Sequence, residues 1–432
     1  KEEIVKGLKK RKFDNLEVID KVIELDLSRK KLQQNLEEIL FESNTISKEI
    51  AEIFKSNESG KNVDDLKKRS STLKSESKTI SEKLDSIKKD LNKHLITIPN
   101  IPDDEVPDGS SEEDNIEIFI SNNDIKETKE FQNHWDIAKE YDILDFELGS
   151  KITGSGFPVY KGAGAKLQRA LISYFLDKNI NAGYLEYNVP HLVNQESAFS
   201  TGQLPDKDGQ MYHIESDNFY LIPTSEVPLT NLYRDVIIEN NELPICMTAY
   251  TPCFRREAGS YGSEVRGLNR VHQFDKVEIV RIEHPDKSEE AFDTMISHVK
   301  SILNELKLDY RVVNLCAGDL GFTSAITYDF EVYSKGQNKW LEISSVSNFR
   351  TFQSNRLNLR YKAEDGKNKH LHTLNGSSLA LPRVMAALLE NNQTKKGITI
   401  PNVLVPYTGS VSYTHLRAHE TREDLVCRRL RE

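Results

Sequence analysis

The stretch CFRREAGSYGSEVRGLNRVHQF at positions 253–274 decides how the rest of this chain is interpreted. TAYTP precedes it and DKVEIV follows it, and both flanking segments have the apolar and β-branched content of strands. The glycine-rich part between them, GSYGSEVRG, predicts the turn of an antiparallel hairpin. Two arginines therefore stand where the first strand ends, and another arginine stands where the second begins.

The hairpin predicts a shared face of polar side chains, because residues two apart on a strand point the same way. We expect Arg255 and Glu257 to share a face on the first strand, and Arg270, His272 and Phe274 to share one on the second. A guanidinium binds phosphate through a planar fork, a phenyl ring stacks on a base, and a carboxylate accepts from an exocyclic amine. The set predicts a nucleotide clamp. The alternative is an exposed salt-bridge cluster on an edge hairpin.

Length and composition narrow the class of protein. The chain has 432 residues, enough for one large domain and a smaller one, with 37% hydrophobic and 29% charged residues. No apolar run approaches the roughly 18 residues of a membrane span, so we expect no membrane partner. The four cysteines have no metal-binding spacing, which favours a reducing, cytoplasmic location. Because the chain begins with Lys1 and not Met, we expect a few N-terminal residues to be missing.

The first hundred residues predict a long antiparallel helical hairpin. A heptad seam runs through Leu32, Leu36, Ile39, Ser43, Ile46, Ile50 and Ile53, and resumes with Leu66, Ser70, Leu73, Ser77, Ile80, Leu84, Ile87 and Leu91. With a turn at Gly60, two helices of about thirty residues would form an arm about 45–50 Å long. The net charge of the chain is −10, yet this segment alone has more Lys and Arg than Asp and Glu. A dimerisation or spacer coiled coil is the alternative to a nucleic-acid-binding arm.

After a proline-rich and acidic linker at 96–115, mixed helices and short strands predict an α+β domain. TFQSNRLNLRYK at 351–362 and NKWLEISSVSNF at 338–349 have the alternation of strands in a sheet with a partly exposed face. We therefore expect an arm and linker at 1–110 and an α+β domain at 111–409. Residues 410–432 concentrate Arg and His without a period and resemble a translated cloning adapter, so we expect a non-native tail; a genuine basic tail is the alternative.

Three segments together resemble the signature motifs of class II aminoacyl-tRNA synthetases. FRRE, the glycine-rich loop and GLNRVHQF resemble motif 2, and NGSSLALPRVMAALLEN at 375–391, where an arginine opens a helix, resembles motif 3. GAGAKLQRALISYFLDKNINAGYLEYNVPHLVN at 162–194 resembles motif 1, which forms the dimer interface in that family. The resemblance implies a mainly antiparallel β-sheet flanked by helices, and a homodimer.

Within class II, further segments are similar to seryl-tRNA synthetases. These are TSEVPLTNLYRD at 224–235, HQFDKVEIV at 272–280 and LEISSVSNFRTFQSNRLNLRY at 341–361. The helical hairpin is similar to the tRNA-binding arm of that family. The resemblance extends in order from residue 1 to about residue 409.

The resemblance implies two groups of site residues. It implies an ATP site made of Arg255, Arg256, Glu257, Arg270, Phe274, Glu342, Ile343, Ser344, Ser345 and Arg383, with Arg255 and Arg383 as catalytic residues. Arg255 would bind the α-phosphate, Glu257 the adenine amine and Phe274 the adenine ring, while Arg383 would lie at the γ-phosphate. Glu342 and Ser345 would hold Mg²⁺.

The serine site implied by the resemblance comprises Thr224, Ser225, Glu226, Glu278, Asn375 and Ser377. Arg256 would also lie near the serine, at a position where family members often have a neutral residue. Glu278 is expected to accept the substrate hydroxyl, because a buried polar group left unpaired by the wrong substrate rejects it strongly.

The implied activity is that of a serine–tRNA ligase with ATP and Mg²⁺. It would convert L-serine and ATP to seryl-adenylate and pyrophosphate, then transfer serine to the 3′-terminal adenosine of tRNA(Ser); whether tRNA(Sec) is also charged stays open. An amino-acid ligase for a carrier protein is an alternative that would not need the helical arm. A catalytically silent, synthetase-like tRNA-binding protein is another, but it should have lost Arg255, Glu342 or Arg383.

Overall fold

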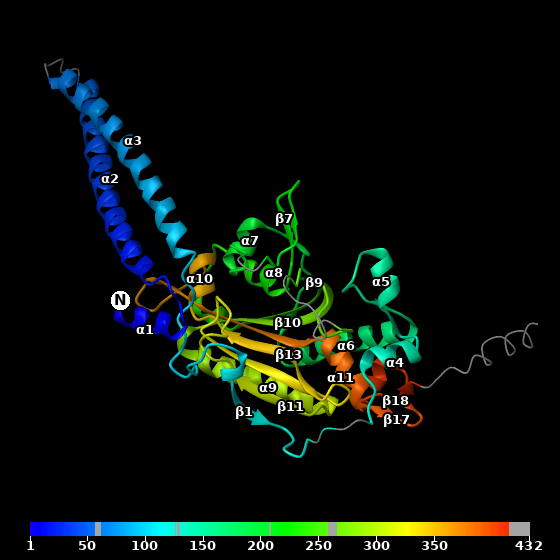
Figure 1. The fold of residues 1–432 in the computed structure, drawn as a ribbon. Helices are drawn as coiled ribbons and strands as arrows, with labels where there is room; N and C mark the ends of the chain where they lie inside the picture. The colour runs from blue at the N-terminus through cyan, green and yellow to red at the C-terminus, as the bar shows by residue number, and fades with distance from the viewer. Residues whose placement is uncertain (57–61, 126, 128–129, 207–208, 258–265, 414–432) are drawn as a thin grey trace, which may run out of the picture. The chain divides into compact units, whose positions relative to one another are not determined.

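The computed structural model divides the chain into two compact units, Lys1–Ile101 and Pro102–Glu432. The structure describes residues 1–56, 62–125, 127, 130–206, 209–257 and 266–413 (Figure 1). The division at Ile101 falls earlier than the expected boundary at residue 110. The expected turn at Gly60 lies outside the described residues. Among the helices of the described part, none is long and apolar enough to cross a bilayer.

The first unit is the predicted antiparallel hairpin of long helices. It consists of α1 (Glu2–Lys10), α2 (Glu17–Ser56) and α3 (Asn62–Leu95), and Figure 1 shows α2 and α3 side by side. With 40 and 34 residues, α2 and α3 are longer than the thirty expected. Seam residues such as Ile46, Leu73 and Leu84 are buried, because neither helix can cover its apolar stripe alone. Arg69 joins the two helices by donating twice to Glu42, at 2.7 and 2.9 Å.

An eight-stranded sheet forms the centre of the second unit. In spatial order its strands are β1 (Ile116–Ile120), β11 (Tyr310–Asn314), β12 (Ile326–Ser334), β13 (Lys339–Asn348), β16 (His372–Ala380), β10 (Gln273–Glu283), β9 (Ile245–Phe254) and β4 (Leu185–Glu186). All neighbours are antiparallel except β4 and β9, which are parallel. The α+β architecture with a mainly antiparallel sheet is confirmed.

The central strands alternate between an apolar face and a polar face. On β10, Val277 and Ile279 belong to the main hydrophobic core, whereas Lys276 and Glu278 line a cavity on the other side. This is the period of two that a strand imposes on its side chains. One face of the sheet therefore packs against the main core, whereas the other carries the cavity and, further along β9 and β10, a second core that includes Met247, Val280 and Ile282.

Helices cover the apolar face of the sheet. The three longest of this unit are α6 (Gly162–Asn181), α9 (Ser288–Leu306) and α11 (Leu381–Asn391), all of which contribute to one core with the strands. On α9, Met295 and Val299 are fully buried four residues apart, as an amphipathic helix requires. Packing of this core fixes the positions of the central strands, and the opposite faces of these strands carry the polar residues of the cavity.

Shorter elements surround the sheet. The other helices are α4 (His134–Glu140), α5 (Phe146–Ile152), α7 (Gln195–Ser200), α8 (Glu226–Asn231), α10 (Phe352–Leu357) and α12 (Val405–Thr408). The small sheets comprise β2 (Leu144–Asp145) with β3 (Val159–Tyr160); β5 (Leu192–Asn194), β7 (Phe219–Leu221) and β6 (His213–Ile214); β15 (Asn368–His370), β14 (Arg360–Lys362) and β8 (Ile237–Ile238); and β17 (Gln393–Thr394), β18 (Gly397–Thr399) and β19 (Ser412–Tyr413).

The start of the expected non-native tail packs with this unit. β19 pairs with β18, and Tyr413 is buried in the main core. Ser412 and Tyr413 are therefore part of the folded sheet, and the tail from residue 414 onward lies outside the described residues.

The strand predicted over 351–362 is wrong in its first half. Residues Phe352–Leu357 form α10, and only Arg360–Lys362 form a strand. Gln353, Ser354 and Leu357 are buried on one side of this short helix, a spacing that fits a helical turn. Asn358 then ends the helix with a left-handed φ of 53°. By contrast, the strand predicted over 338–349 is confirmed as β13.

Candidate active site

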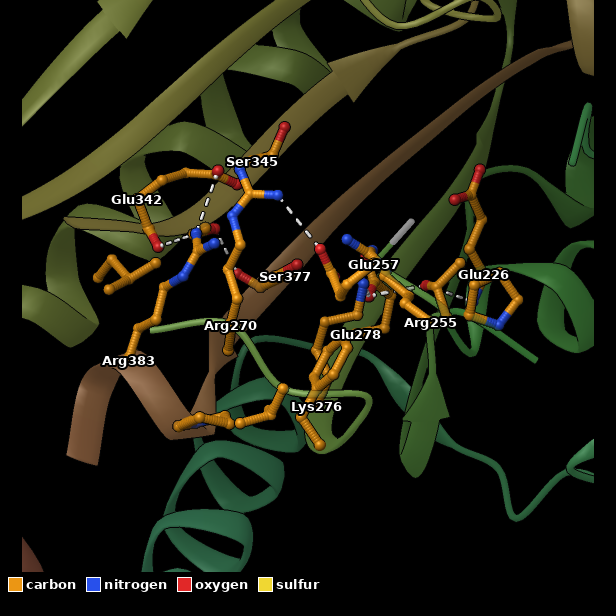
Figure 2. A pocket seen from close by; sticks show the side chains of 18 of the residues that line it. Glu226, Arg255, Glu257, Arg270, Lys276, Glu278, Glu342, Ser345, Ser377 and Arg383 are labelled. Atoms are coloured by element: carbon orange, nitrogen blue, oxygen red, sulfur yellow. Dashed lines mark hydrogen bonds and ion pairs between the residues drawn. The ribbon is translucent and has the colours of Figure 1, made fainter. Parts of the chain in front are cut away.

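A cavity of about 540 Å³ opens on the polar face of the central strands β10, β13 and β16 (Figure 2). Its walls are completed by the end of β9, the segment before β10 and the start of α11. In the view of Figure 2, Glu342 and Arg383 lie at one end and Glu226 lies at the other, with Arg270 and Arg255 between them. Both arginines expected to be catalytic, Arg255 and Arg383, thus line the same cavity.

Arg383 is held by three backbone or carboxylate oxygens. It is the third residue of α11, directly after the β16 strand, so its side chain projects from the first helical turn beside the sheet. Its Nη1 donates to the backbone oxygen of Glu342 at 2.7 Å and to the Glu342 carboxylate at 3.2 Å, and its Nε donates to the Asn269 oxygen at 2.8 Å. A guanidinium fixed in this way presents its remaining N–H groups in a defined direction.

The hairpin of β9 and β10, called here the arginine hairpin, provides a cation beside an aromatic ring. The Arg255 guanidinium lies 5.3 Å from the centre of the Phe274 ring, and Phe274 pairs in register with Cys253. Arg270 Nη1 donates to Glu257 Oε2 at 3.2 Å. Cation, ring and carboxylate therefore meet at one wall of the cavity, as the nucleotide-clamp prediction requires.

The predicted strand faces of this hairpin are wrong for the residues next to the turn. β9 ends at Phe254 and β10 begins only at Gln273, and Glu257 has a left-handed φ of 47°. His272 stacks on Phe157 at 5.2 Å and does not line the cavity. The turn residues 258–265 lie outside the described part. Glu257 and Arg270 reach the cavity from irregular backbone, not from a continuous strand face.

Two buried carboxylates lie at the other end of the cavity, with different partners. Glu278 Oε2 is 2.5 Å from Lys276 Nζ and accepts from Thr224 Oγ1 at 3.1 Å. Glu226, at the start of α8, accepts from Gln353 Nε2 at 2.6 Å. A lysine thus neutralises Glu278, whereas the nearest hydrogen-bond partner of Glu226 is a neutral amide.

Burial, and secondly the charge of Glu278, raise the pKa of Glu226 from 4.5 to about 7. The hydrogen bond from Gln353 and the charge of Lys276 act in the opposite direction but are weaker. A buried carboxylate in this state gains a partner when a cation enters the cavity. Glu226 is therefore a buried carboxylate without a cationic hydrogen-bond partner among the described residues.

Most residues expected from the sequence line the cavity together. They are Thr224, Glu226, Arg255, Glu257, Arg270, Phe274, Glu278, Glu342, Ile343, Ser344, Ser345, Asn375, Ser377 and Arg383. Arg256 and Ser225 do not line it. The Arg256 backbone N–H donates to the Gln210 oxygen at 2.9 Å, and the fully buried Ser225 donates to the Ala249 oxygen at 3.4 Å.

Sequence reasoning missed several cavity residues. Lys276 could have been found by extending the period of two from Phe274 to Glu278 along β10. Gln203 and Gln210 also line the cavity, but they come from an irregular segment without a period. Gln353, which holds Glu226, was hidden because its segment was predicted to be a strand.

The residues expected to hold Mg²⁺ provide suitable oxygen ligands. Glu342 has a half-exposed side chain at the cavity, and Ser345 is three residues further along β13. Asp329 pairs in register with Ser345, and its Oδ1 is buried without a hydrogen-bond partner among the described residues. Burial and the charge of Glu342 raise the pKa of Asp329. Mg²⁺ prefers such carboxylate and hydroxyl oxygens together with phosphate and water, so the residues fit this ion.

An antiparallel sheet with an arginine hairpin, and a helix opened by a second arginine over the same cavity, define the class II aminoacyl-tRNA synthetases. The comparisons agree. Residues 212–392 match the model of the tRNA synthetase class II core domain (G, H, P, S and T), and residues 1–102 match that of the seryl-tRNA synthetase N-terminal domain. The chain belongs to the seryl-tRNA synthetase family.

Individual relatives are similar over nearly their whole length. The serine–tRNA ligase of Cellvibrio japonicus is 45% identical over 412 residues, which cover 94% of this chain and 95% of the relative. That of Salinibacter ruber is 43% identical over 413 residues, again 94% and 95%. The crystal structure of seryl-tRNA synthetase from Pyrococcus horikoshii complexed with ATP has a TM-score of 0.86 and 31% identity, covering 96% of this chain and 97% of that one. The family and the ligase function predicted from the sequence are confirmed.

Proposed function

We propose that this chain performs both steps of serine–tRNA ligation in the cavity described above. L-serine and ATP would first form seryl-adenylate and pyrophosphate, and the seryl group would then pass to a ribose hydroxyl of the 3′-terminal adenosine of tRNA(Ser), with AMP as the leaving group. The observation that carries the proposal is the division of the cavity into an arginine-rich end and an end with two buried carboxylates. A triphosphate matches the first, and the ammonium and hydroxyl groups of serine match the second.

The arginine-rich end favours ATP through charge and stacking. Arg255 is proposed to bind the α-phosphate, with the adenine ring on Phe274 and its amine at Glu257. Arg383 is proposed to bind the γ-phosphate end, 2.8 Å from the Asn269 carbonyl that orients it. As the serine carboxylate attacks the α-phosphorus, negative charge shifts toward pyrophosphate, and fixed guanidinium groups stabilise that charge.

The carboxylate end favours serine. Glu226 is proposed to bind the ammonium group, because Glu278 already has a cationic partner in Lys276. Glu278 and Thr224 would then hold the hydroxyl, with Asn375 and Ser377 lining the same wall. A substrate without a hydroxyl leaves the Glu278 carboxylate without one hydrogen-bond partner, which can lower kcat/KM for that substrate by a factor of roughly 10⁴–10⁵.

Proximity supplies the rest of the catalysis. Holding the two reactants side by side can contribute up to about 7–11 kcal/mol to lowering the barrier. Glu342 and Ser345, with Asp329 behind them, are proposed to hold Mg²⁺. When bound, this ion supplies charge neutralisation on the phosphate oxygens.

The helical unit is proposed to bind tRNA, since it leans positive while the rest of the chain is acidic. Its presence disfavours a carrier-protein ligase, and the intact cavity disfavours a silent tRNA-binding protein.

We further propose a homodimer through the motif 1 segment. A cytoplasmic location fits the cysteines Cys246, Cys253 and Cys316, which are free in the described structure. M. kandleri SerRS, which is 16% identical to this chain, has been crystallised in complex with A. aeolicus tRNASec, and charging of tRNA(Sec) is an extension that the proposal does not include.

The test is serine-dependent exchange of pyrophosphate into ATP, with wild type and Arg255→Gln. The variant keeps a hydrogen-bonding side chain but loses the cation at the α-phosphate, so kcat/KM for ATP should fall at least about a hundredfold. The matched control is Arg281→Gln. Arg281 is on β10, the strand that pairs with β9 before Arg255, but it forms an ion pair with Glu283 and does not line the cavity. Wild-type exchange by Arg255→Gln would contradict the proposed role.

A further inference from the structure

His134 and Glu390 form a fully buried pair outside the cavity. His134 is the first residue of α4, Glu390 is the penultimate residue of α11, and both side chains have no solvent exposure. His134 Nδ1 lies 2.6 Å from Glu390 Oε1. Polar groups that are buried this deeply need a full set of partners to be tolerated. Those partners show what the pair holds.

The side-chain hydrogen bonds of Glu390 with the described residues are all ones that its carboxylate accepts. Its Oε1 accepts from the His134 backbone N–H at 2.9 Å and from Gln337 Nε2 at 3.0 Å, in addition to the His134 ring. Its Oε2 accepts from the Ser334 hydroxyl. A carboxylate with four donors is satisfied as an acceptor, so His134 must carry its proton on Nδ1.

The other ring nitrogen of His134 holds the segment that leads into the cavity. The backbone N–H of Leu268 donates to His134 Nε2 at 2.8 Å. A backbone amide can only donate, so Nε2 must be unprotonated, which agrees with the proton on Nδ1. The packing there is tight: a Cβ on Gly267 would lie 2.2 Å from His134 Nε2, and Gly267 has a left-handed φ of 67°.

The next residue along this segment contacts the catalytic arginine. The Asn269 carbonyl accepts from Arg383 Nε at 2.8 Å, and its side chain donates to Gln337 Oε1 at 2.8 Å. Arg383 and Glu390 are about two turns apart on α11, and therefore on the same side of that helix. Asn269 is thus bonded directly to Arg383 near the start of α11, and Leu268 is linked through His134 to Glu390 near the end of α11. Arg270 is the next residue in the chain.

We infer that His134 is a positioning residue for the triphosphate end of the ATP site. His134 fixes the backbone of Leu268 and Asn269. That backbone in turn fixes the directions of the Arg383 and Arg270 side chains. Glu390 supplies the tautomer of His134 that can accept the Leu268 N–H. This inference rests on the proposed binding of ATP by the arginines of the cavity. It predicts a defect in the use of ATP and not of serine, since Glu226 and Glu278 lie outside this network.

Two substitutions separate the two ring nitrogens. In His134→Asn the amide can take the place of Nδ1 and donate to Glu390, but no acceptor remains for Leu268. In His134→Gln the amide oxygen can take the place of Nε2 and accept from Leu268, but the donor to Glu390 is lost. Pyrophosphate exchange is measured for the full chain with ATP and serine varied in turn, and the melting temperature is recorded for each variant.

The expected result is a selective loss in His134→Asn. Its kcat/KM for ATP falls about tenfold, as expected for one lost buried hydrogen bond, while kcat/KM for serine at saturating ATP changes less than about twofold. His134→Gln stays within about threefold of wild type for ATP and shows its effect in the melting temperature. The matched control is His298→Asn, because His298 is also largely buried and bonds Asn179, away from the cavity.

Three outcomes would overturn the inference: wild-type use of ATP by a folded His134→Asn, equal losses for ATP and serine, or an ATP defect in His134→Gln as large as that in His134→Asn. If neither His134 variant folds, Gly267→Ala displaces the same backbone from His134 and must show the same ATP-selective loss. Arg383→Ala is measured in parallel. Normal use of ATP by Arg383→Ala would refute the proposed function itself, whereas an impaired Arg383→Ala beside an unimpaired His134→Asn refutes only the positioning role.

Discussion

Replacing Glu226 by Gln should make the protein more stable while removing its use of serine. Glu226 is buried near Glu278 and has no cationic partner as close as Lys276 is to Glu278. Gln is nearly the same size, and its side-chain oxygen can still accept from Gln353 Nε2. The substitution therefore removes a buried negative charge and leaves the local packing and this hydrogen bond in place.

The size of the stabilisation follows from the raised pKa of Glu226. A pKa that rises from 4.5 in the unfolded chain to about 7 in the folded chain corresponds to roughly 3 kcal/mol, at about 1.4 kcal/mol per pH unit. The folded state binds the proton more tightly, so the wild-type free energy of unfolding falls as pH rises from 4.5 to 7. Gln does not titrate and avoids this fall. The variant should gain up to about 3 kcal/mol at pH 8 and almost nothing at pH 4.5.

The assay is urea unfolding of wild type and Glu226→Gln at pH 5 and pH 8, without serine or ATP. The difference in midpoint should be large at pH 8 and small at pH 5. Pyrophosphate exchange on the same samples should show at least about a hundredfold lower kcat/KM for serine, since a neutral amide can accept a hydrogen bond from the ammonium group but cannot form an ion pair with it. A variant that is equally or less stable than wild type at pH 8, or that uses serine normally, would refute this role of Glu226.

Three further predictions concern the two buried carboxylates of the cavity and the helical unit. Below pH 7, wild-type kcat/KM for serine should fall toward tenfold per pH unit, because protonated Glu226 cannot bind ammonium; a flat profile from pH 6 to 8 in pyrophosphate exchange would contradict this. Glu278→Ala should abolish serine-dependent exchange, with near-normal exchange as the contradicting result. Deleting residues 1–101 should spare exchange but remove tRNA charging, and it keeps Asp103, whose ion pair with Arg350 at 2.6 Å belongs to the second unit; normal charging by the truncated chain would exclude the arm from tRNA binding.

The sequence predicted the parts of the site that regular structure places. Phe274 is on the regular strand β10, where the period of two fixes its direction, whereas Glu278, on the same strand, was implied by the family resemblance. The heptad seam likewise predicted the helical hairpin, since its pattern continues for many turns. Local periodicity is visible in one sequence, so these elements needed no knowledge of tertiary contacts.

The remainder depended on tertiary contacts or irregular backbone. The direction of Glu257 follows from a left-handed residue beyond the strand end, which no alternation predicts. Gln353 escaped notice because a buried helical turn resembles a strand over so few residues. His134 and Glu390 are 256 positions apart in the chain, and only the folded core brings them together.

The central claim, that one cavity selects serine and joins it to ATP, is tested most directly by pyrophosphate exchange with each of the twenty amino acids in turn. Serine should support exchange, and alanine and glycine, which lack the hydroxyl, should support at least about a thousandfold less. Equal exchange with alanine and serine, or exchange with another amino acid but not with serine, would contradict the claim.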